Sequence, residues 1–158
     1  MSHLVLSREI FCPLDAVFGY VSDLTRAPEW WPNVSQVERV DAAGPIDVGT
    51  RYRLAYNMFG RQFPVDVTVT EMVPNERTVL EIHGQIDATF RNDFRATARS
   101  RTRVTVIIEY EVPSVLGKVV NALLVERRNA ADADHAFDQL KNILEHDAIA
   151  RIDEGVVL

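Results

Sequence analysis

The last long segment of the chain, residues 114–148, reads SVLGKVVNALLVERRNAADADHAFDQLKNILEHDA. Pro113 ends whatever precedes it, and Ser114 is a favourable N-cap residue. Apolar residues then recur at steps of three and four, with one Glu among them: Val119, Leu123, Glu126, Ala130, Ala133, Phe137, Leu140, Leu144 and Ala148. This spacing predicts one face of an α-helix about 50 Å long, which would cross nearly the whole of a chain this size.

The predicted apolar stripe is uneven along the helix. Large residues occupy both ends, whereas Ala130 and Ala133 lie near the middle, beside Glu126. Small residues at mid-helix leave space above whatever the helix covers. Either a bulky strand residue fills that space, or a ligand cavity lies under the helix, and the spacing leaves both interpretations open.

The sequence before this helix predicts one strand and two short helices. Residues 3–11 alternate as a strand that places Arg8 on the same face as Leu4, Leu6 and Ile10. Helical spacing follows over residues 14–21, after Pro13. Asp23 is a suitable cap for a second short helix, which should stop before Pro28.

The middle of the chain has the period-two alternation of β-strands. The expected strands cover residues 34–40, 50–58, 63–71, 78–82, 86–96 and 104–112, with a tight hairpin at residues 59–61. In the third of these, Glu71 follows Val65, Val67 and Val69 on one face. Short connections between consecutive strands predict an antiparallel sheet, and only the C-terminal helix is long enough to cover its apolar face.

Composition and charge exclude several classes of protein. The chain has 158 residues, 47% of them hydrophobic, which is typical of a globular protein, and we expect one domain over residues 1–158 with an ordered core at about 3–147. A net charge of -6 argues against nucleic-acid binding. No apolar run is long enough to span a membrane and no secretory signal is visible. With Cys12 as the single cysteine, the default expectation is a reducing cytoplasm.

Three local motifs resemble those of a known superfamily. They are Ile10-Phe11-Cys12-Pro13 followed by Ala16-Val17-Phe18, then Pro28-Glu29-Trp30-Trp31-Pro32, and the closing residues 137–145, FDQLKNILE. Together with the element order, they resemble the START-like (SRPBCC, helix-grip) superfamily, of the polyketide cyclase/dehydrase and lipid-transport type. The resemblance implies an α+β fold in which a curved seven-stranded antiparallel sheet grips the long helix, with a cavity between them.

The same resemblance implies a class of ligand. Members of the superfamily bind lipids, sterols, polyketides, plant hormones or quinones, and some are cyclases. No catalytic motif of one subfamily is present in this chain. We therefore expect binding or carriage of a small, mostly apolar molecule, with a polyketide cyclase, aromatase or dehydratase as the alternative, and leave the oligomeric state open.

Candidate ligand-binding residues are the polar and aromatic side chains on otherwise apolar faces, with the small helix residues opposite them. They are Arg8, Tyr52, Tyr56, Glu71, Phe90, Asn92, Phe94, Tyr110, Glu126, Ala130 and Ala133. A buried charge is unfavourable unless it is paired. Three interpretations therefore remain open: Arg8 pairs with Glu71 or Glu126, one of these side chains contacts a polar group of the ligand, or Arg8 lies in water at the edge of the sheet. For an enzyme, Arg8, Glu71, Tyr56 or His83 would hold or move protons.

Other features have a structural and a functional interpretation. Trp30 and Trp31 either anchor their loop to the sheet or form a wall of the cavity, and Phe59-Gly60 forms either a plain turn or a gate. The spacing of Asp132, Asp134, His135 and Asp138 suits a metal poorly, so we expect no metal and no cofactor. The Arg-rich segment 91–103 predicts a solvated outer face, or a docking patch for an acidic partner.

Overall fold

The structure is a computed structural model that describes residues 2–111 and 122–155. In chain order the elements are β1 (Ser2–Ile10), α1 (Leu14–Ser22), the 3-10 helix η1 (Leu24–Glu29), β2 (Val34–Arg39), β3 (Arg51–Met58), β4 (Arg61–Val73), β5 (Arg77–His83), β6 (Ala88–Ala98), β7 (Arg101–Tyr110) and α3 (Ala122–Gly155). The predicted order of one strand, two short helices, six strands and one long helix is confirmed.

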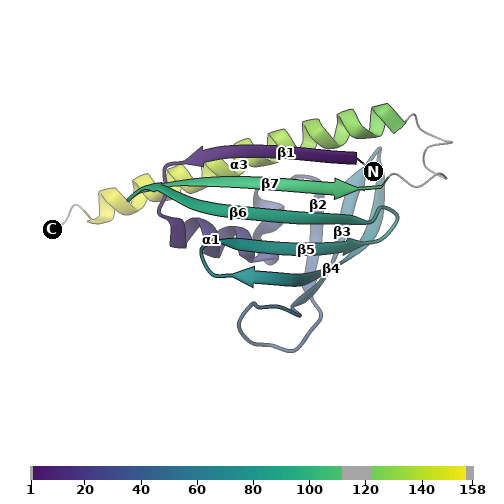
Figure 1. Ribbon diagram of the computed structural model, residues 1–158, viewed down its shortest axis with the longest axis horizontal. Coiled ribbons are helices and arrows are strands. Elements are labelled where there is room, and N and C mark those ends of the chain that lie inside the picture. Colours follow the sequence, from purple (N-terminus) through teal and green to yellow (C-terminus); the bar gives the residue numbers. More distant parts are fainter. Residues whose placement is uncertain (1, 112–121, 156–158) are drawn as a thin grey trace.

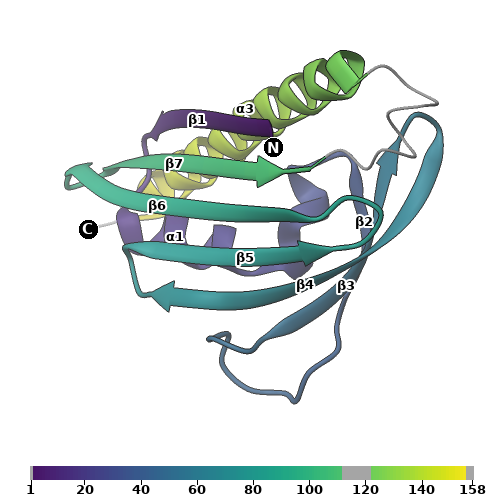
Figure 2. The ribbon, with the colours of Figure 1, turned by 45° about the vertical axis from the view of Figure 1, so that its right-hand side comes forward.

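All seven strands form one antiparallel sheet in the order β1-β7-β6-β5-β4-β3-β2. Figures 1 and 2 show that the sheet curves and that α1 and α3 lie on the same side of it, with α3 passing along β1. The predicted helix-grip fold, in which the sheet wraps around the long helix, is therefore confirmed. A twisted sheet with one apolar face needs such a cover.

Strand alternation gives the inner face of the sheet its apolar character. In β7, every second residue from Thr102 to Tyr110 is buried, and the residues between them are more exposed. Two clusters of buried side chains result. One joins α1, Trp30, Trp31, β7 and α3, and the other joins Leu24 to β3, β4 and β5.

Helix α3 buries a face that differs from the predicted stripe in its first half. Its buried residues are Val125, Ala133, Ala136, Phe137, Leu140, Leu144 and Ala148. Val125 is buried where Glu126 was expected, and Glu126 and Ala130 are only partly buried. The expected start at Ser114 and the side chains of Val119 and Leu123 fall outside the described parts. The helix continues to Gly155, past the predicted end at Ala148.

The second short helix departs from prediction at Pro28, which lies inside η1. Asp23 caps it as predicted, since its Oδ1 accepts a hydrogen bond from the Thr25 backbone N–H at 3.1 Å. The N–H of Arg26 donates to the Asp23 carbonyl, and that of Trp30 donates to the Ala27 carbonyl. The turns on either side of Pro28 thus close without the N–H that proline lacks.

Strand β4 contains a bulge that the alternation did not predict. Val69 pairs with Leu80, but Glu71 pairs with Val79, so one extra residue lies between these two pairs. An inserted residue moves everything after it to the other face of the sheet. Glu71 therefore lies on the outer face, whereas Val69 lies on the inner one.

No helix in the described ranges 2–111 and 122–155 is both long enough and apolar enough to cross a membrane.

Candidate functional site

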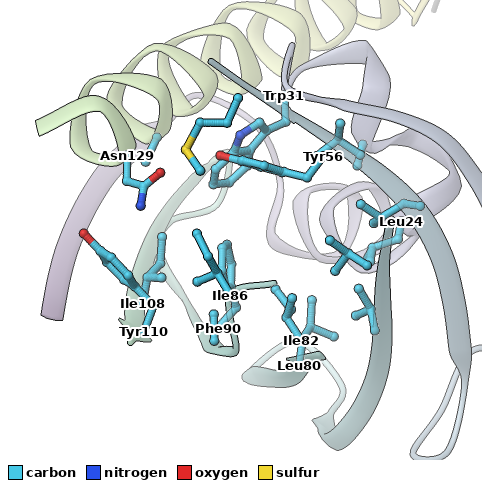
Figure 3. Close-up of a pocket in the computed structure, with 18 of the residues that line it drawn as sticks. Leu24, Trp31, Tyr56, Leu80, Ile82, Ile86, Phe90, Ile108, Tyr110 and Asn129 are labelled. Atoms are coloured by element: carbon cyan, nitrogen blue, oxygen red, sulfur yellow. The ribbon is translucent and has the colours of Figure 1, made fainter. Parts of the chain in front are cut away.

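A cavity lies between the inner face of the sheet, the α1–η1 region and α3 (Figure 3). Its volume is about 160 Å³. That is comparable to an engineered protein cavity of about 150 Å³ that takes up benzene. The space is therefore large enough for an organic molecule of one or two rings. Among the described side chains of α3, those of Asn129, Ala133 and Phe137 line the wall, and the small Ala133 leaves room over the strands.

The cavity wall is mainly aliphatic and aromatic. Most of its apolar residues come from the inner face of β3 to β7, among them Leu54, Val65, Leu80, Ile82, Phe90 and Ile108. Among the described residues that line it, none is Asp, Glu, Lys, Arg or His. Its polar atoms belong to neutral side chains: Tyr56, Gln85, Asn92, Tyr110, Asn129 and the two tryptophans.

Trp30 and Trp31 both anchor their loop and form the wall, so the two interpretations of this pair are compatible. They are 7% and 6% exposed, and both line the cavity. Their rings pack on Phe137 of α3, with centroids 5.5 Å and 6.0 Å from it, and Trp31 also lies 5.7 Å from Phe90. These edge-to-face and tilted contacts connect the loop to helix and sheet.

The hydroxyl of Tyr56 lies in an unusual electrostatic setting. Burial, followed by the negative charge of Asp132, raises the pKa of Tyr56 to about 12, and the nearby Trp31 indole N–H acts in the opposite direction. Trp31 Nε1 is buried and has no hydrogen-bond partner of normal geometry among the described residues. Tyr56 therefore stays protonated at neutral pH and keeps an O–H that can donate.

Asp132 is held beside the site by a short network. Its Oδ2 accepts a hydrogen bond from Asn33 Nδ2 at 3.1 Å, and its Oδ1 lies 3.3 Å from Arg128 Nε. The same Asn33 amide donates to the Asn57 carbonyl at 2.9 Å. The loop before β2, the end of β3 and helix α3 are thus joined at one point next to Tyr56.

Five of the predicted site residues line the cavity: Tyr56, Phe90, Asn92, Tyr110 and Ala133. Asn92 also donates to Thr78 Oγ1 at 3.2 Å, which fixes its amide on the inner face. Asn129 and Gln85 also line the cavity, but sequence reasoning missed them. Asn129 lies four residues after Val125 and four before Ala133 and so shares their helix face, but the predicted stripe passed through Glu126 and Ala130 instead.

The other predicted site residues lie outside the cavity wall. Arg8 pairs with Asp134 and with Asp138 Oδ1, the latter at 3.0 Å, so the expected pairing with Glu71 or Glu126 is wrong. Glu71, on the outer face, lies 3.5 Å from Arg77. Phe94 packs edge-on against Phe18, with ring centroids 5.1 Å apart. Tyr52 is fully buried in the cluster around Leu24. Glu126 and Ala130 flank the lining face of α3 without joining it.

Several surface features have structural roles. The Arg-rich β6–β7 hairpin forms ion pairs on the outer face, with Arg91 to Asp93 at 3.0 Å and Arg103 to Glu9 at 3.8 Å. His83 is 61% exposed in its side chain and lies 3.6 Å from both Glu81 and Asp87. Among the described residues, no cluster of His, Cys, Asp and Glu side chains is arranged to hold a metal ion.

Comparison with known proteins places the chain in a family. Residues 1–145 match the family described as "Polyketide cyclase / dehydrase and lipid transport". No functionally curated protein matches the sequence.

Solved structures share this fold at low sequence identity. TTHA0849 from Thermus thermophilus is 18% identical, with a TM-score of 0.78 over 93% of this chain and 99% of that one. A START superfamily protein from Mycobacterium smegmatis is 15% identical, with a TM-score of 0.74 over 91% and 97%. The Zhui aromatase/cyclase from a Streptomyces species is 12% identical, with a TM-score of 0.72 over 96% and 95%.

Proposed function

Because this chain belongs to the polyketide cyclase/dehydrase and lipid-transport family, we propose that it binds or carries a small, mostly apolar molecule in the cavity between the sheet and α3. The candidate ligands are lipids, sterols, quinones and aromatic polyketides. The observation that carries the proposal is a cavity lined by apolar and neutral side chains, with no ionisable group other than tyrosine among its described lining residues. An apolar ligand bound against such a wall removes apolar surface from water, and this lowers the free energy of the complex.

The same wall favours an uncharged ligand. A carboxylate or ammonium group moved from water into this cavity would lose its hydration without meeting an opposite charge. Charged groups on β1 and α3 outside the cavity wall already have partners, since Asp132 pairs with Arg128, and Arg8 with Asp134 and Asp138. We therefore expect neutral rings or chains to bind better than fatty-acid anions of the same size.

An aromatase, cyclase or dehydratase is the second candidate, because the Zhui aromatase/cyclase and the BexL di-domain ARO/CYC share the fold. General acid-base catalysis requires a group that gives and takes protons near neutral pH. The raised pKa of Tyr56 makes it a poor base. Arg8 and Glu71 pair with other side chains outside the cavity, and His83 is exposed. Binding is therefore the better supported of the two activities.

Native mass spectrometry of the protein purified from its own host tests the proposal. We expect a non-covalent adduct that organic solvent releases as a neutral, mainly apolar compound. Repeated preparations without an adduct, together with no thermal stabilisation by sterols, quinones, aromatic polyketides or neutral lipids, would refute it. Incubation of a captured compound with the protein separates the two candidates, since a carrier returns it unchanged and an enzyme changes its mass or its absorption spectrum.

A further inference from the structure

Three neutral polar groups from distant parts of the chain meet at one end of the cavity. Tyr56 comes from β3, Tyr110 from the last position of β7 and Asn129 from α3. In Figure 3 the Asn129 amide and the Tyr110 hydroxyl face each other, and the Tyr56 hydroxyl is turned toward the same end. Figure 3 also shows Leu24, Leu80 and Ile82 at the opposite end, where the wall is aliphatic.

Two of these groups, Tyr110 and Asn129, have no hydrogen-bond partner among the residues that the structure describes. Tyr110 is 6% exposed, yet within the described ranges neither its hydroxyl nor the Asn129 amide forms a hydrogen bond. The Tyr56 oxygen faces the Trp31 indole N–H, which leaves the hydrogen of the Tyr56 hydroxyl free to donate. Tyr110 is buried, and Tyr56 and Asn129 are partly buried, so their free donors in the cavity wall are placed to bind a ligand atom.

From this arrangement we propose that Tyr56, Tyr110 and Asn129 form a polar end of the cavity that binds an uncharged oxygen of the ligand, such as a ketone, quinone or hydroxyl oxygen. The ligand's apolar body would then extend toward Leu24 and Leu80. This inference rests on the proposed function and names the group by which the ligand is oriented.

The electrostatics of the polar end favour a neutral oxygen over a carboxylate. All three groups are uncharged donors, and the amide can also accept. The charge of Asp132 acts on Tyr56 more strongly than the opposing charge of Arg128. The carboxylate of Asp132 therefore disfavours an anion beside Tyr56, in addition to the cost of burying its charge.

Three naphthalene probes of nearly equal shape test the proposal. They are 2-acetylnaphthalene, with a ketone oxygen, 2-isopropenylnaphthalene, with a methylene group in its place, and 2-naphthoate, with a carboxylate. Their dissociation constants for the wild-type protein are measured at pH 7 by calorimetry. We expect 2-naphthoate to bind at least about tenfold more weakly than the ketone, because its charge has no partner in the cavity.

Variants identify the groups that bind the oxygen. The variants are Tyr56→Phe, Tyr110→Phe and Asn129→Leu. At least one should raise the dissociation constant of the ketone by roughly three- to tenfold, the effect of losing one hydrogen bond. The same variant should leave the dissociation constant of the hydrocarbon within about twofold of the wild-type value. Tyr52→Phe is the matched control. It removes a buried hydroxyl from the same face of β3, outside the cavity, and should leave both dissociation constants within about twofold.

The result separates this proposal from the proposed function. If the ketone and the hydrocarbon bind but all three variants affect them equally, or if 2-naphthoate binds as tightly as the ketone, the polar end is refuted and the apolar cavity stands. If neither neutral probe binds the wild-type protein, both proposals fail. Within each variant, the ratio of the dissociation constants of the two neutral probes does not depend on how much of the protein is folded.

Discussion

Arg8 connects the edge strand β1 to α3. Its Nε donates to Asp138 Oδ1 at 3.0 Å, and its guanidinium also binds the Asp134 carboxylate. Partial burial acts to lower the pKa of Arg8, but the hydrogen bonds to the two carboxylates outweigh it and raise the pKa. The Arg8 side chain is 19% exposed, whereas the side chains of Asp134 and Asp138 are each 59% exposed, so water screens this pairing mainly from the carboxylate side.

We predict that Arg8→Met lowers the free energy of unfolding by about 1–3 kcal/mol, because two carboxylates lose a charged hydrogen-bond donor. Binding of 2-acetylnaphthalene should stay within about twofold, since Arg8 does not line the cavity. Arg53→Met is the control, because its pair with Asp66 is 64% and 61% exposed and should contribute less than about 1 kcal/mol. Urea unfolding gives the free energy of unfolding of both variants. Equal decreases in the two would contradict a special role for Arg8.

Tyr56 makes the stability of the fold depend on pH in the alkaline range. Its pKa rises from 10.0 to about 12 in the folded state, because burial and Asp132 favour the neutral phenol. The resulting stabilisation is therefore complete below about pH 10 and is lost as the pH rises toward about 12.

We predict that Tyr56→Phe reduces the loss of stability between about pH 10 and pH 12, as measured by urea unfolding at each pH. The difference in phenolate absorbance between wild type and variant should have its midpoint near pH 12. A midpoint near pH 10 would place the Tyr56 hydroxyl in water and contradict its buried position. Tyr20 and Tyr52 also have raised pKa values, so the variant should remove only part of the pH dependence.

Strand residues of the site were easier to predict than helix residues. Tyr56, Phe90, Asn92 and Tyr110 follow from alternation, because every second residue of a strand must face the same side. Asn129 did not, because neighbouring positions on a helix are only about 100° apart and the packing partner decides between them. The identity of Arg8's partners was likewise not predictable, since it depends on how far α3 slides along β1.

At the level of elements, the bulge in β4 marks a limit of pattern reasoning. Alternation predicted the strand and most of its inward residues, including Val65, Val67 and Val69. It placed Glu71 inside, because a single extra residue leaves no mark in a hydrophobic pattern. The observed register explains why a carboxylate is tolerated there, since Glu71 lies outside and meets Arg77.

Substitution by alanine should have opposite effects on stability at two glycines. Gly19 lies within α1, where an added Cβ would have nothing within 4 Å, so Gly19→Ala should stabilise by about 0.5–1 kcal/mol. At Gly84, the Cβ would lie 2.9 Å from the Pro64 carbonyl oxygen, so Gly84→Ala should destabilise by about 1–3 kcal/mol. Thermal unfolding of both variants checks this. Stabilisation by Gly84→Ala would mean that β4 and the end of β5 are further apart than described.

At the scale of the whole molecule, the curved sheet and α3 enclose a space that neither could enclose alone. The strands supply a continuous apolar surface, and the small Ala133 keeps the helix backbone over it without filling the gap. The fold was predictable because strand periods, turns and a long amphipathic helix all point to the same architecture. Which side chains remain free inside the cavity depends on the relative phase of helix and sheet, which the sequence pattern does not encode.

Filling the cavity under α3 tests whether it is the ligand site. Ala133→Trp should occupy the space, whereas Ala131→Trp places the same side chain on the exposed face of the same helix. Calorimetry with 2-acetylnaphthalene should show binding at least about tenfold weaker in Ala133→Trp and within about twofold of wild type in Ala131→Trp. Circular dichroism confirms that both variants are folded. Undiminished binding by a folded Ala133→Trp protein would show that the ligand binds outside this cavity.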